Sequence, residues 1–219
     1  MPFKARGRGT DYEEIDRFDG GVGWIAHPEE GMRRASHALA TENGVYAVDP
    51  VDADGVDDLF AEFGGLAGTV VLMDRHARDA AAIADRHDVP VYVPSFVDPE
   101  IETATQPVSG ALPGSDYGVV RTVDWPGWDE AALWDGETLV VGDALGTTDY
   151  FKTADERLGV HPLLRISPPR RLGGFQPERI LVGHGEGVLS EATTALDDAL
   201  DGARRRAPKV WLNGLKQFL

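Results

Sequence analysis

The chain contains no cysteine among its 219 residues. Without thiols it can form no disulfide framework, no thiolate metal ligand and no thiol nucleophile. Zinc fingers are therefore excluded. Any metal ion must be held by histidine and carboxylate side chains.

Lysine is scarce as well: only four of the 21 basic residues are lysine, whereas aspartate outnumbers glutamate by 23 to 14 and the formal net charge is -16. A solvent very rich in salt permits such a surface, because screening at molar ionic strength shortens the Debye length to about 3 Å. We therefore expect a halophilic source, with the acidity an adaptation to the solvent. The same charge repels phosphate backbones and anionic lipids, so we expect neither general nucleic-acid binding nor membrane binding.

Long hydrophobic runs are also absent. No stretch approaches the ~20 apolar residues that a membrane-spanning helix needs. The first residues, Met1-Pro-Phe-Lys-Ala-Arg-Gly-Arg-Gly9, carry charge but no hydrophobic segment of a signal peptide. We expect a soluble, cytoplasmic protein, and its oligomeric state stays open, with a homo-oligomer as one alternative.

The N-terminal half, about residues 1–115, is predicted to begin with short strands. Residues 36–40 and 45–48 flank Asn43-Gly44, which is the sequence signal of a β-hairpin with a type I′ turn. A buried strand over 69–73, a helix over 77–87 and a strand over 89–93 follow, since apolar runs alternate with helical spacing. The segment 95–117 is rich in Pro, Gly, Ser and Thr, which predicts a linker between two halves.

The C-terminal half, about residues 116–205, is predicted to repeat this theme. Its expected strands cover 118–123, 131–134, 139–141 and 180–182, and a helix is expected over about 189–205. The tail 206–219 completes a single domain. Beyond Asp201 the chain has five basic residues and no acidic one, so we interpret this tail as a docking segment.

Polar residues follow three of the predicted strands, where open α/β folds place their ligands. They are Asp74-Arg75-His76-Ala77-Arg78-Asp79, then Gly142-Asp143, then Gly183-His184-Gly185. If these strand ends converge, they offer two imidazoles and two carboxylates. That ligand set suits zinc, iron or manganese, and its members are His76, Asp79, Asp143 and His184.

The order of these motifs resembles that of the metallo-β-lactamase superfamily of metal-dependent hydrolases. The points of resemblance are Val48-Asp49 after the hairpin, the loop from Asp74 to Asp79, Trp125-Pro-Gly-Trp128, Gly142-Asp143 and Gly183-His184-Gly185. Five points in the family's order are more specific than any one of them. The resemblance implies a four-layer αββα sandwich in which each half supplies one sheet and its covering helices.

The residues depart from the family's pattern at the metal site. The family's His-x-His-x-Asp-His motif corresponds to residues 74–79, where His76 alone matches, and the His of its Pro-Gly-His turn is replaced by Trp128. Arg78 stands in place of a metal-binding aspartate, and a guanidinium has only donors and cannot ligate a metal. The usual dinuclear zinc centre is therefore not expected.

Two interpretations of these residues stay open. In the first, Arg78 takes the electrostatic place of a metal ion by pairing with carboxylates, and the chain is a binding or structural protein without a cofactor. In the second, Asp74 or Asp79 helps to hold one zinc, iron or manganese ion, and the chain is a hydrolase of unknown substrate. A small-molecule ligand suits both, and the residues expected to line its pocket are Arg75, Arg78, Trp128, Arg170 and Arg171.

Overall fold

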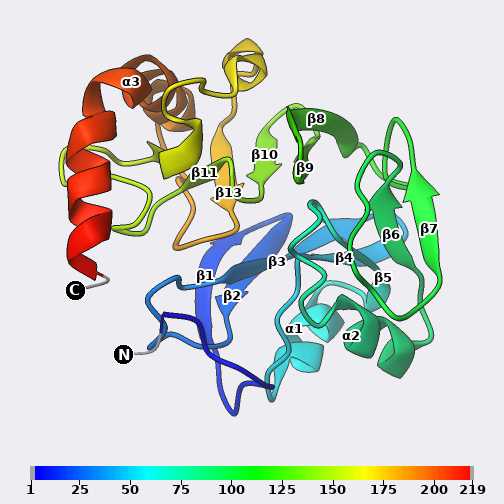
Figure 1. Ribbon diagram of the computed structural model, residues 1–219. Coiled ribbons are helices and arrows are strands. Elements are labelled where there is room, and N and C mark those ends of the chain that lie inside the picture. The colour runs from blue at the N-terminus through cyan, green and yellow to red at the C-terminus, as the bar shows by residue number, and fades with distance from the viewer. Residues whose placement is uncertain (1–2, 218–219) are drawn as a thin grey trace.

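The computed structural model describes residues 3–217, and side chains as far as residue 213. Two β-sheets pack face to face between two layers of helices, which is the αββα sandwich that the sequence predicts (Figure 1). A further two-stranded sheet, β11 and β12, lies beside the second sheet. Its strands are Leu145–Gly146 and Gly159–Val160.

The larger sheet has seven strands in the order of the chain. Strands β1 to β4 pair antiparallel, whereas β4 to β7 pair parallel. The parallel pairs need crossovers, and the helices α1 and α2 lie in two of them. The strands are β1 (Glu13–Phe18), β2 (Gly21–Ile25), β3 (Ala35–Thr41), β4 (Gly44–Val48), β5 (Leu66–Val70), β6 (Val91–Pro94) and β7 (Thr105–Val108).

The smaller sheet has four strands in the order β13-β10-β9-β8. Strands β8 and β9 form a hairpin through Pro126-Gly127, and β10 pairs antiparallel with β9 and parallel with β13. The strands are β8 (Gly118–Trp125), β9 (Trp128–Trp134), β10 (Thr138–Val141) and β13 (Arg179–Val182). Two short 3-10 helices, η1 (Pro162–Leu164) and η2 (Arg170–Gly174), precede β13.

Alternating side chains of the strands build the layers. In β4, Tyr46 and Val48 face the second sheet, while Val45 and Ala47 face α1 (Val56–Glu62). Strand β10 divides in the same way, since Val140 lies between the sheets and its two neighbours lie under α3 (Ala192–Gln217). Helix α2 (Ala80–His87) covers β5 and β6.

Three local predictions need correction. Strands β3 and β4 form the predicted hairpin, but its turn residues are Glu42 and Asn43. Neither has a positive φ, so the turn is not type I′. The helix expected from residue 77 begins at Ala80, because Arg78 has a φ of 39°. The expected linker 95–117 contains a strand, β7, which hydrogen-bonds to β6.

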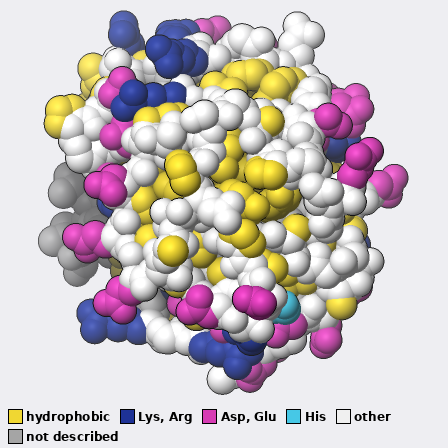
Figure 2. Space-filling model, turned by 90° about the vertical axis from the view of Figure 1, so that its right-hand side faces the viewer, with side chains coloured by type: hydrophobic (Ala, Val, Ile, Leu, Met, Phe, Trp, Pro, Cys, Tyr) yellow, Lys and Arg dark blue, Asp and Glu magenta, His cyan; other side chains and the backbone are white. Residues whose placement is uncertain are grey.

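The C-terminal helix is longer than predicted. It continues through Pro208 to Gln217, so the tail predicted to dock is the end of α3, and residues 218–219 lie outside the described residues. Its docking role stays a prediction. Among the described residues, no helix is long and apolar enough to cross a membrane. In the face shown in Figure 2, hydrophobic side chains gather towards the centre and acidic side chains lie mainly near the edges.

Asp16 ties the first strand to the loop after β13. Its two carboxylate oxygens both lie 2.8 Å from the backbone N–H of Gly187, which donates to them. Burial raises the pKa of Asp16 from its ordinary value of 3.8 to about 6; the Gly187 N–H opposes this rise and nearby Glu186 adds to it. The folded state therefore binds this proton more tightly than the unfolded chain does.

This linkage gives a pH dependence with a definite sign. The stabilisation is complete below the unfolded pKa and is lost as pH rises through about 6. Asp16→Asn should remove this part of the pH dependence. The difference in free energy of unfolding, variant minus wild type, should therefore become more positive by about 1 to 2 kcal/mol between pH 4 and pH 8. Urea unfolding of both proteins at the two pH values measures this difference. Asp85→Asn, at an exposed position of α2, is the control, and an equal change there would contradict the assignment.

Candidate functional site

Four strand ends meet at one edge of the sandwich. Asp49 follows β4, His76 lies in the loop after β5, Asp143 follows β10 and His184 follows β13. The two sheets are joined at this edge by His37 of β3, whose Nε2 lies 3.0 Å from the carbonyl oxygen of Val182. Because β4 and β5 run parallel, and so do β10 and β13, their carboxyl ends present these side chains together.

His76, Asp143 and His184 form a buried cluster. Asp143 Oδ1 lies 3.0 Å from His76 Nε2 and 2.9 Å from His184 Nε2. Nevertheless this oxygen is buried and accepts no well-directed hydrogen bond. Tetrahedral ligands at about 2.0–2.2 Å from one metal ion are themselves about 3.3–3.6 Å apart, a few tenths of an ångström more than these two distances. The three atoms could hold a metal ion, and the unsatisfied oxygen fits that role.

The far nitrogen of each imidazole has its own partner. His76 Nδ1 lies 2.7 Å from Asp49 Oδ2, and His184 Nδ1 lies 2.8 Å from the carbonyl oxygen of Met32. The second oxygen of Asp49 accepts from the N–H of Leu72. A carboxylate or carbonyl that holds the distal N–H leaves Nε2 as the free lone pair, which is the usual arrangement around a metal-ligating histidine.

The charges within the cluster are strongly coupled. Burial by itself would raise the pKa of Asp143, but the imidazoles of His76 and His184 hold it well below its usual range. Burial lowers the pKa of His184, with a smaller opposing effect of Asp143. Burial and Arg78 also act to lower the pKa of His76, but the carboxylates of Asp143 and Asp49 outweigh them and raise it.

Glycines permit the close approach of these loops. A Cβ at residue 183 would lie 3.2 Å from His76 Cε1 and 2.9 Å from the carbonyl oxygen of Gly142. At residue 185 the backbone has a φ of +88°, and a Cβ there would lie 2.3 Å from Thr147 Oγ1. Glycine on both sides of His184 is therefore required by the packing at these positions.

Arg78 lies beside the cluster and bonds to backbone carbonyls. Its Nη1 donates to the oxygens of Ala35 (2.6 Å) and Asp49 (2.7 Å), and its Nη2 donates to that of Gly183 (3.1 Å). Nη2 also lies 3.4 Å from His76 Nε2. The pairing with carboxylates expected from the sequence is not found in the part of the chain that the structure describes. Arg78 instead joins the start of β3 to the loops after β4 and β13.

Trp128 and Arg75 flank the cluster. The Arg75 guanidinium carbon lies 4.6 Å from the centroid of the Trp128 ring, and its Nη2 is 3.5 Å from Asp143 Oδ2. Glu130 fixes the Trp128 ring and the backbone after Asp143, since it accepts from Trp128 Nε1 (2.9 Å) and from the N–H of Ala144 (3.0 Å). Burial and the nearby Asp143 carboxylate raise the pKa of Glu130 to about 8.

Aromatic rings surround the imidazoles. Phe151 stacks on His184 at 5.4 Å, and His161 contacts Phe151 at 5.3 Å and Trp128 at 4.7 Å between ring centroids. Burial lowers the pKa of His161 to about 4. Its Nδ1 accepts from the N–H of Leu163, so the proton of the neutral ring is on Nε2.

Other predicted site residues lie elsewhere. Asp79 points away from the cluster, because its Oδ2 accepts from the N–H of Asp52. Asp74 is in the same loop as His76, but it is not among the three residues that converge, although its Oδ1 is buried without a hydrogen bond. Arg170 and Arg171 line a separate cavity of about 250 Å³ beside Trp125.

Three residues of the site were not predicted as such. Asp49, which orients His76, is one of the five points of resemblance but not a predicted site residue, although an aspartate directly after a strand is a signal of the same kind as Asp143. Glu130 and His161 carry no recognisable motif. Both are 7% exposed or less, and their burial follows from packing between distant segments.

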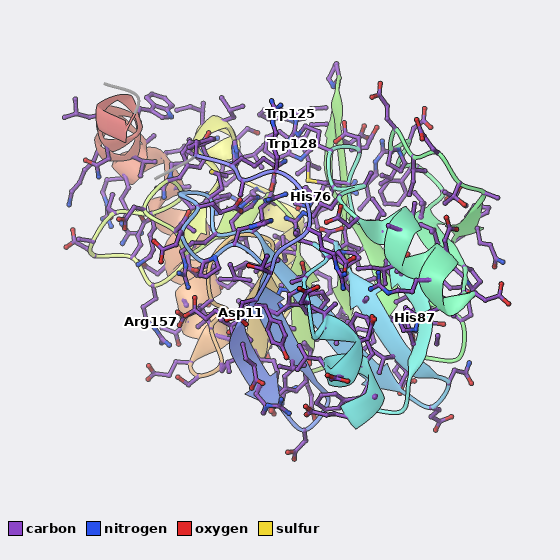
Figure 3. The ribbon with its side chains drawn as sticks, turned by 90° about the horizontal axis from the view of Figure 1, so that it is seen from below. Asp11, His76, His87, Trp125, Trp128 and Arg157 are labelled. Carbon is purple, nitrogen blue, oxygen red and sulfur yellow. The ribbon has the colours of Figure 1, made fainter. Side chains whose placement is uncertain are left out.

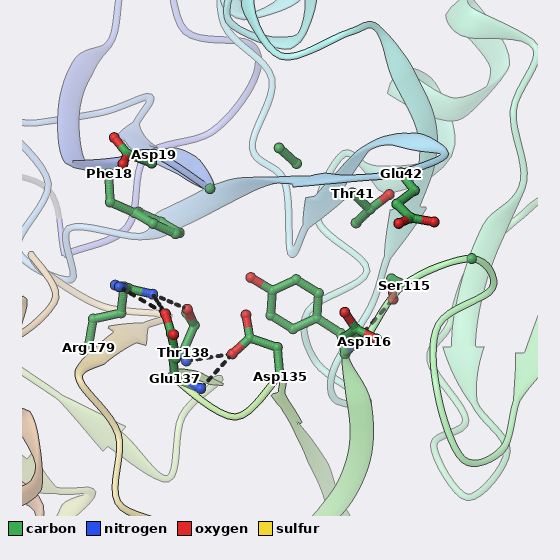
Figure 4. Close-up of a pocket in the computed structure, with 14 residues that line it drawn as sticks. Phe18, Asp19, Thr41, Glu42, Ser115, Asp116, Asp135, Glu137, Thr138 and Arg179 are labelled. Carbon is green, nitrogen blue, oxygen red and sulfur yellow. Dashed lines mark hydrogen bonds and ion pairs between the residues drawn. The ribbon is translucent and has the colours of Figure 1, made fainter.

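Larger cavities lie outside the cluster. One of about 1000 Å³ adjoins it through Gly185 and Thr148. Another, of about 1030 Å³, lies at the opposite end of the strands and is lined mainly by acidic and hydroxyl side chains (Figure 4). There Arg179 is held by Glu137 and Thr138.

The layers, the strand order and a histidine–aspartate cluster at this edge define the metallo-β-lactamase fold, and comparison with solved structures shows the same fold. DIM-1 metallo-β-lactamase matches with a TM-score of 0.61 and 13% identity over 91% of this chain and 98% of that one. ETHE1 from Myxococcus xanthus has a TM-score of 0.58 and 16% identity, covering 93% and 90%. TTHA1623 in a di-iron-bound form has a TM-score of 0.52 and 19% identity, covering 72% and 90%. No protein-family model and no curated protein sequence matches the chain.

Proposed function

We propose that this protein is a hydrolase that uses one divalent metal ion held by His76, Asp143 and His184. The observation that carries the proposal is the convergence of the two imidazole Nε2 atoms on Asp143 Oδ1, which is buried and otherwise unsatisfied. Three protein ligands leave a position open for water or substrate, as catalytic zinc sites do, whereas structural zinc sites use four. One fold neighbour has been solved in a di-iron-bound form, which supports metal binding on this fold.

A divalent metal ion bound there would act as a Lewis acid and lower the pKa of a water molecule. The chain's own residues prepare the site. Asp49 and the Met32 carbonyl oxygen fix the orientation and tautomer of the two imidazoles. Arg75 reaches Asp143 Oδ2, so that Oδ1 stays directed at the imidazoles. Glu130 holds the backbone directly after Asp143.

A second function is favoured by one observation, the position of Arg78. Its Nη2 lies 3.4 Å from His76 Nε2, where its charge opposes that of a bound cation. If the guanidinium keeps metal out, the chain is a binding protein that retains the fold without hydrolysis. In this alternative the protein functions without a bound metal ion.

Metal analysis separates the two functions. Protein purified without chelator should contain about one equivalent of zinc, iron or manganese, as a single three-ligand site requires. Mass spectrometry of the digested protein measures the metal content. Dialysis against each ion separately restores any metal that was lost during purification. A content below about a tenth of an equivalent after all three dialyses would establish the metal-free alternative. Loss of ester, thioester or phosphodiester hydrolysis on chelation, and its return with the metal, tests the reaction itself.

A further inference from the structure

We propose that Arg75 and the neighbouring tryptophans form a binding site for a small organic carboxylate with a flat apolar group. The proposal rests on the proposed function in one respect: this ligand would be the substrate, or part of it, presented to the His76–Asp143–His184 cluster. The binding site itself consists of side chains that the structure places beside that cluster.

Arg75 is held in one orientation while most of its donors stay free. Its guanidinium lies over the Trp128 ring and its Nη2 reaches Asp143 Oδ2 at 3.5 Å. The side chain is nevertheless 48% exposed. A guanidinium has five N–H donors, and the bond to Asp143 uses one of them among the described residues. Its outer edge is therefore available, in a fixed plane, for the two parallel hydrogen bonds that a carboxylate accepts.

The tryptophans supply an apolar surface next to this edge. Trp128 is fixed by Glu130 and by the ring of His161. Trp125 packs edge-on against Trp128, with centroids 6.4 Å apart, and is 40% exposed. Figure 3 shows both tryptophans close together near His76. An exposed aromatic side chain at the mouth of a buried polar site can stack with the flat part of a ligand.

The charge of the site favours an anion over a neutral ligand. Two guanidiniums, Arg75 and Arg78, lie with the carboxylates of Asp49 and Asp143 at the cluster, so these four side chains carry no net negative charge. The whole chain, by contrast, has a net charge of -16. An anion at the outer edge of Arg75 therefore gains a charge-assisted pair that a neutral ligand lacks. A monoanionic carboxylate meets about half the repulsion from Asp143 that a dianionic phosphate would meet.

The test uses phenylacetate as the probe and phenylacetamide as its uncharged equivalent. Binding is followed through the indole N–H signals of ¹⁵N-labelled protein, with those of Trp125 and Trp128 assigned from Phe variants. Phenylacetate should shift both signals, and Arg75→Ala should weaken its binding at least about tenfold, as expected for a charge-assisted pair. The affinity of Arg75→Lys for phenylacetate should lie between those of wild type and Arg75→Ala, because lysine keeps the charge but not the planar guanidinium. Phenylacetamide should bind at least about tenfold more weakly than phenylacetate.

The matched control is Arg171→Ala, which removes an exposed arginine from the cavity on the other side of Trp125. It should leave phenylacetate binding unchanged. Equal binding by wild type and Arg75→Ala would overturn the inference, and so would an equal loss in Arg171→Ala, which would indicate bulk charge. Circular dichroism and the melting temperature verify that each variant is folded.

The titrations are carried out on metal-loaded and on chelator-treated protein. If no metal binds but phenylacetate still requires Arg75, the proposed hydrolase fails and the carboxylate site stands. If a metal binds and Arg75 has no effect, the carboxylate site fails by itself. Binding that depends on the metal but not on Arg75 means that the probe ligates the metal directly, which also overturns the inference.

Discussion

Asp143→Asn is expected to lower the affinity for zinc, iron(II) or manganese(II) by about a hundredfold or more, since loss of an outer-shell partner alone costs roughly 10–100-fold. Asp143 supplies the only carboxylate oxygen among the three atoms that converge. The amide keeps nearly the same shape but carries no charge, so it offsets less of the cation's charge. Titration of chelator-treated protein against a chromophoric competitor measures the affinity.

Asp74→Asn is the matched control for this variant. It makes the same change in the neighbouring loop, outside the cluster, and should alter the metal affinity by less than about threefold. A large loss in Asp74→Asn would show that Asp74 is a ligand after all. Equal affinities of Asp143→Asn and wild type would refute the cluster as the metal site. The fold of both variants is checked by circular dichroism.

Arg165→Met is expected to have the largest effect on stability, a loss of about 3 to 5 kcal/mol in the free energy of unfolding. Arg165 and Glu156 are both fully buried, and their two hydrogen bonds measure 3.1 and 3.0 Å. Arg165 also donates to the carbonyl oxygens of Phe151 and Val160. Methionine fills similar volume but leaves the buried Glu156 carboxylate with the longer ion pair to Arg206, at 3.6 Å, in place of two close hydrogen bonds from Arg165. Urea unfolding at neutral pH measures the loss.

Arg157→Met removes an arginine from the same segment and serves as control. Its ion pair with Glu191 is exposed on both sides, so the expected loss is below about 1 kcal/mol. Comparable losses in the two variants would contradict the role of the buried pair. The pair also supports the site, because Phe151 stacks on His184 and Val160 precedes His161.

Much of the fold could be predicted from local patterns. Consecutive apolar residues predicted β10 and β13 as buried strands, whereas the strand predicted over 69–73 overlaps only the end of β5 (Leu66–Val70). The order of the motifs predicted the αββα sandwich. Turn geometry was less accessible: the hairpin between β3 and β4 turns at Glu42 and Asn43. The strand β7 was missed because its Pro- and Gly-rich surroundings resemble a linker, whereas its pairing with β6 supplies the hydrogen bonds that local sequence does not show.

The site could be predicted only in part, for a similar reason. His76, Asp143 and His184 follow predicted strands, so their convergence was expected once parallel pairing was assumed. Asp79 was expected with them. The left-handed backbone of Arg78, with a φ of 39°, delays the helix, and Asp79 Oδ2 accepts from the N–H of Asp52. A side chain's direction depends on such backbone angles, which the residue type alone does not specify.

The sequence by itself determined which chemistry was available. Without cysteine, only imidazoles and carboxylates could hold a metal ion, and the residues at 74, 78, 79 and 128 depart from the metal motif of the resembled family. Only the tertiary structure decided which of these groups meet. It brings Asp49 to His76, leaves Asp143 Oδ1 unsatisfied between two imidazoles, and binds Arg78 to three backbone carbonyls from distant segments. The physical reason is that hydrogen bonds and charge pairs act over a few ångströms, whereas the residues that make them lie far apart in the chain and are joined only when the sheets pack.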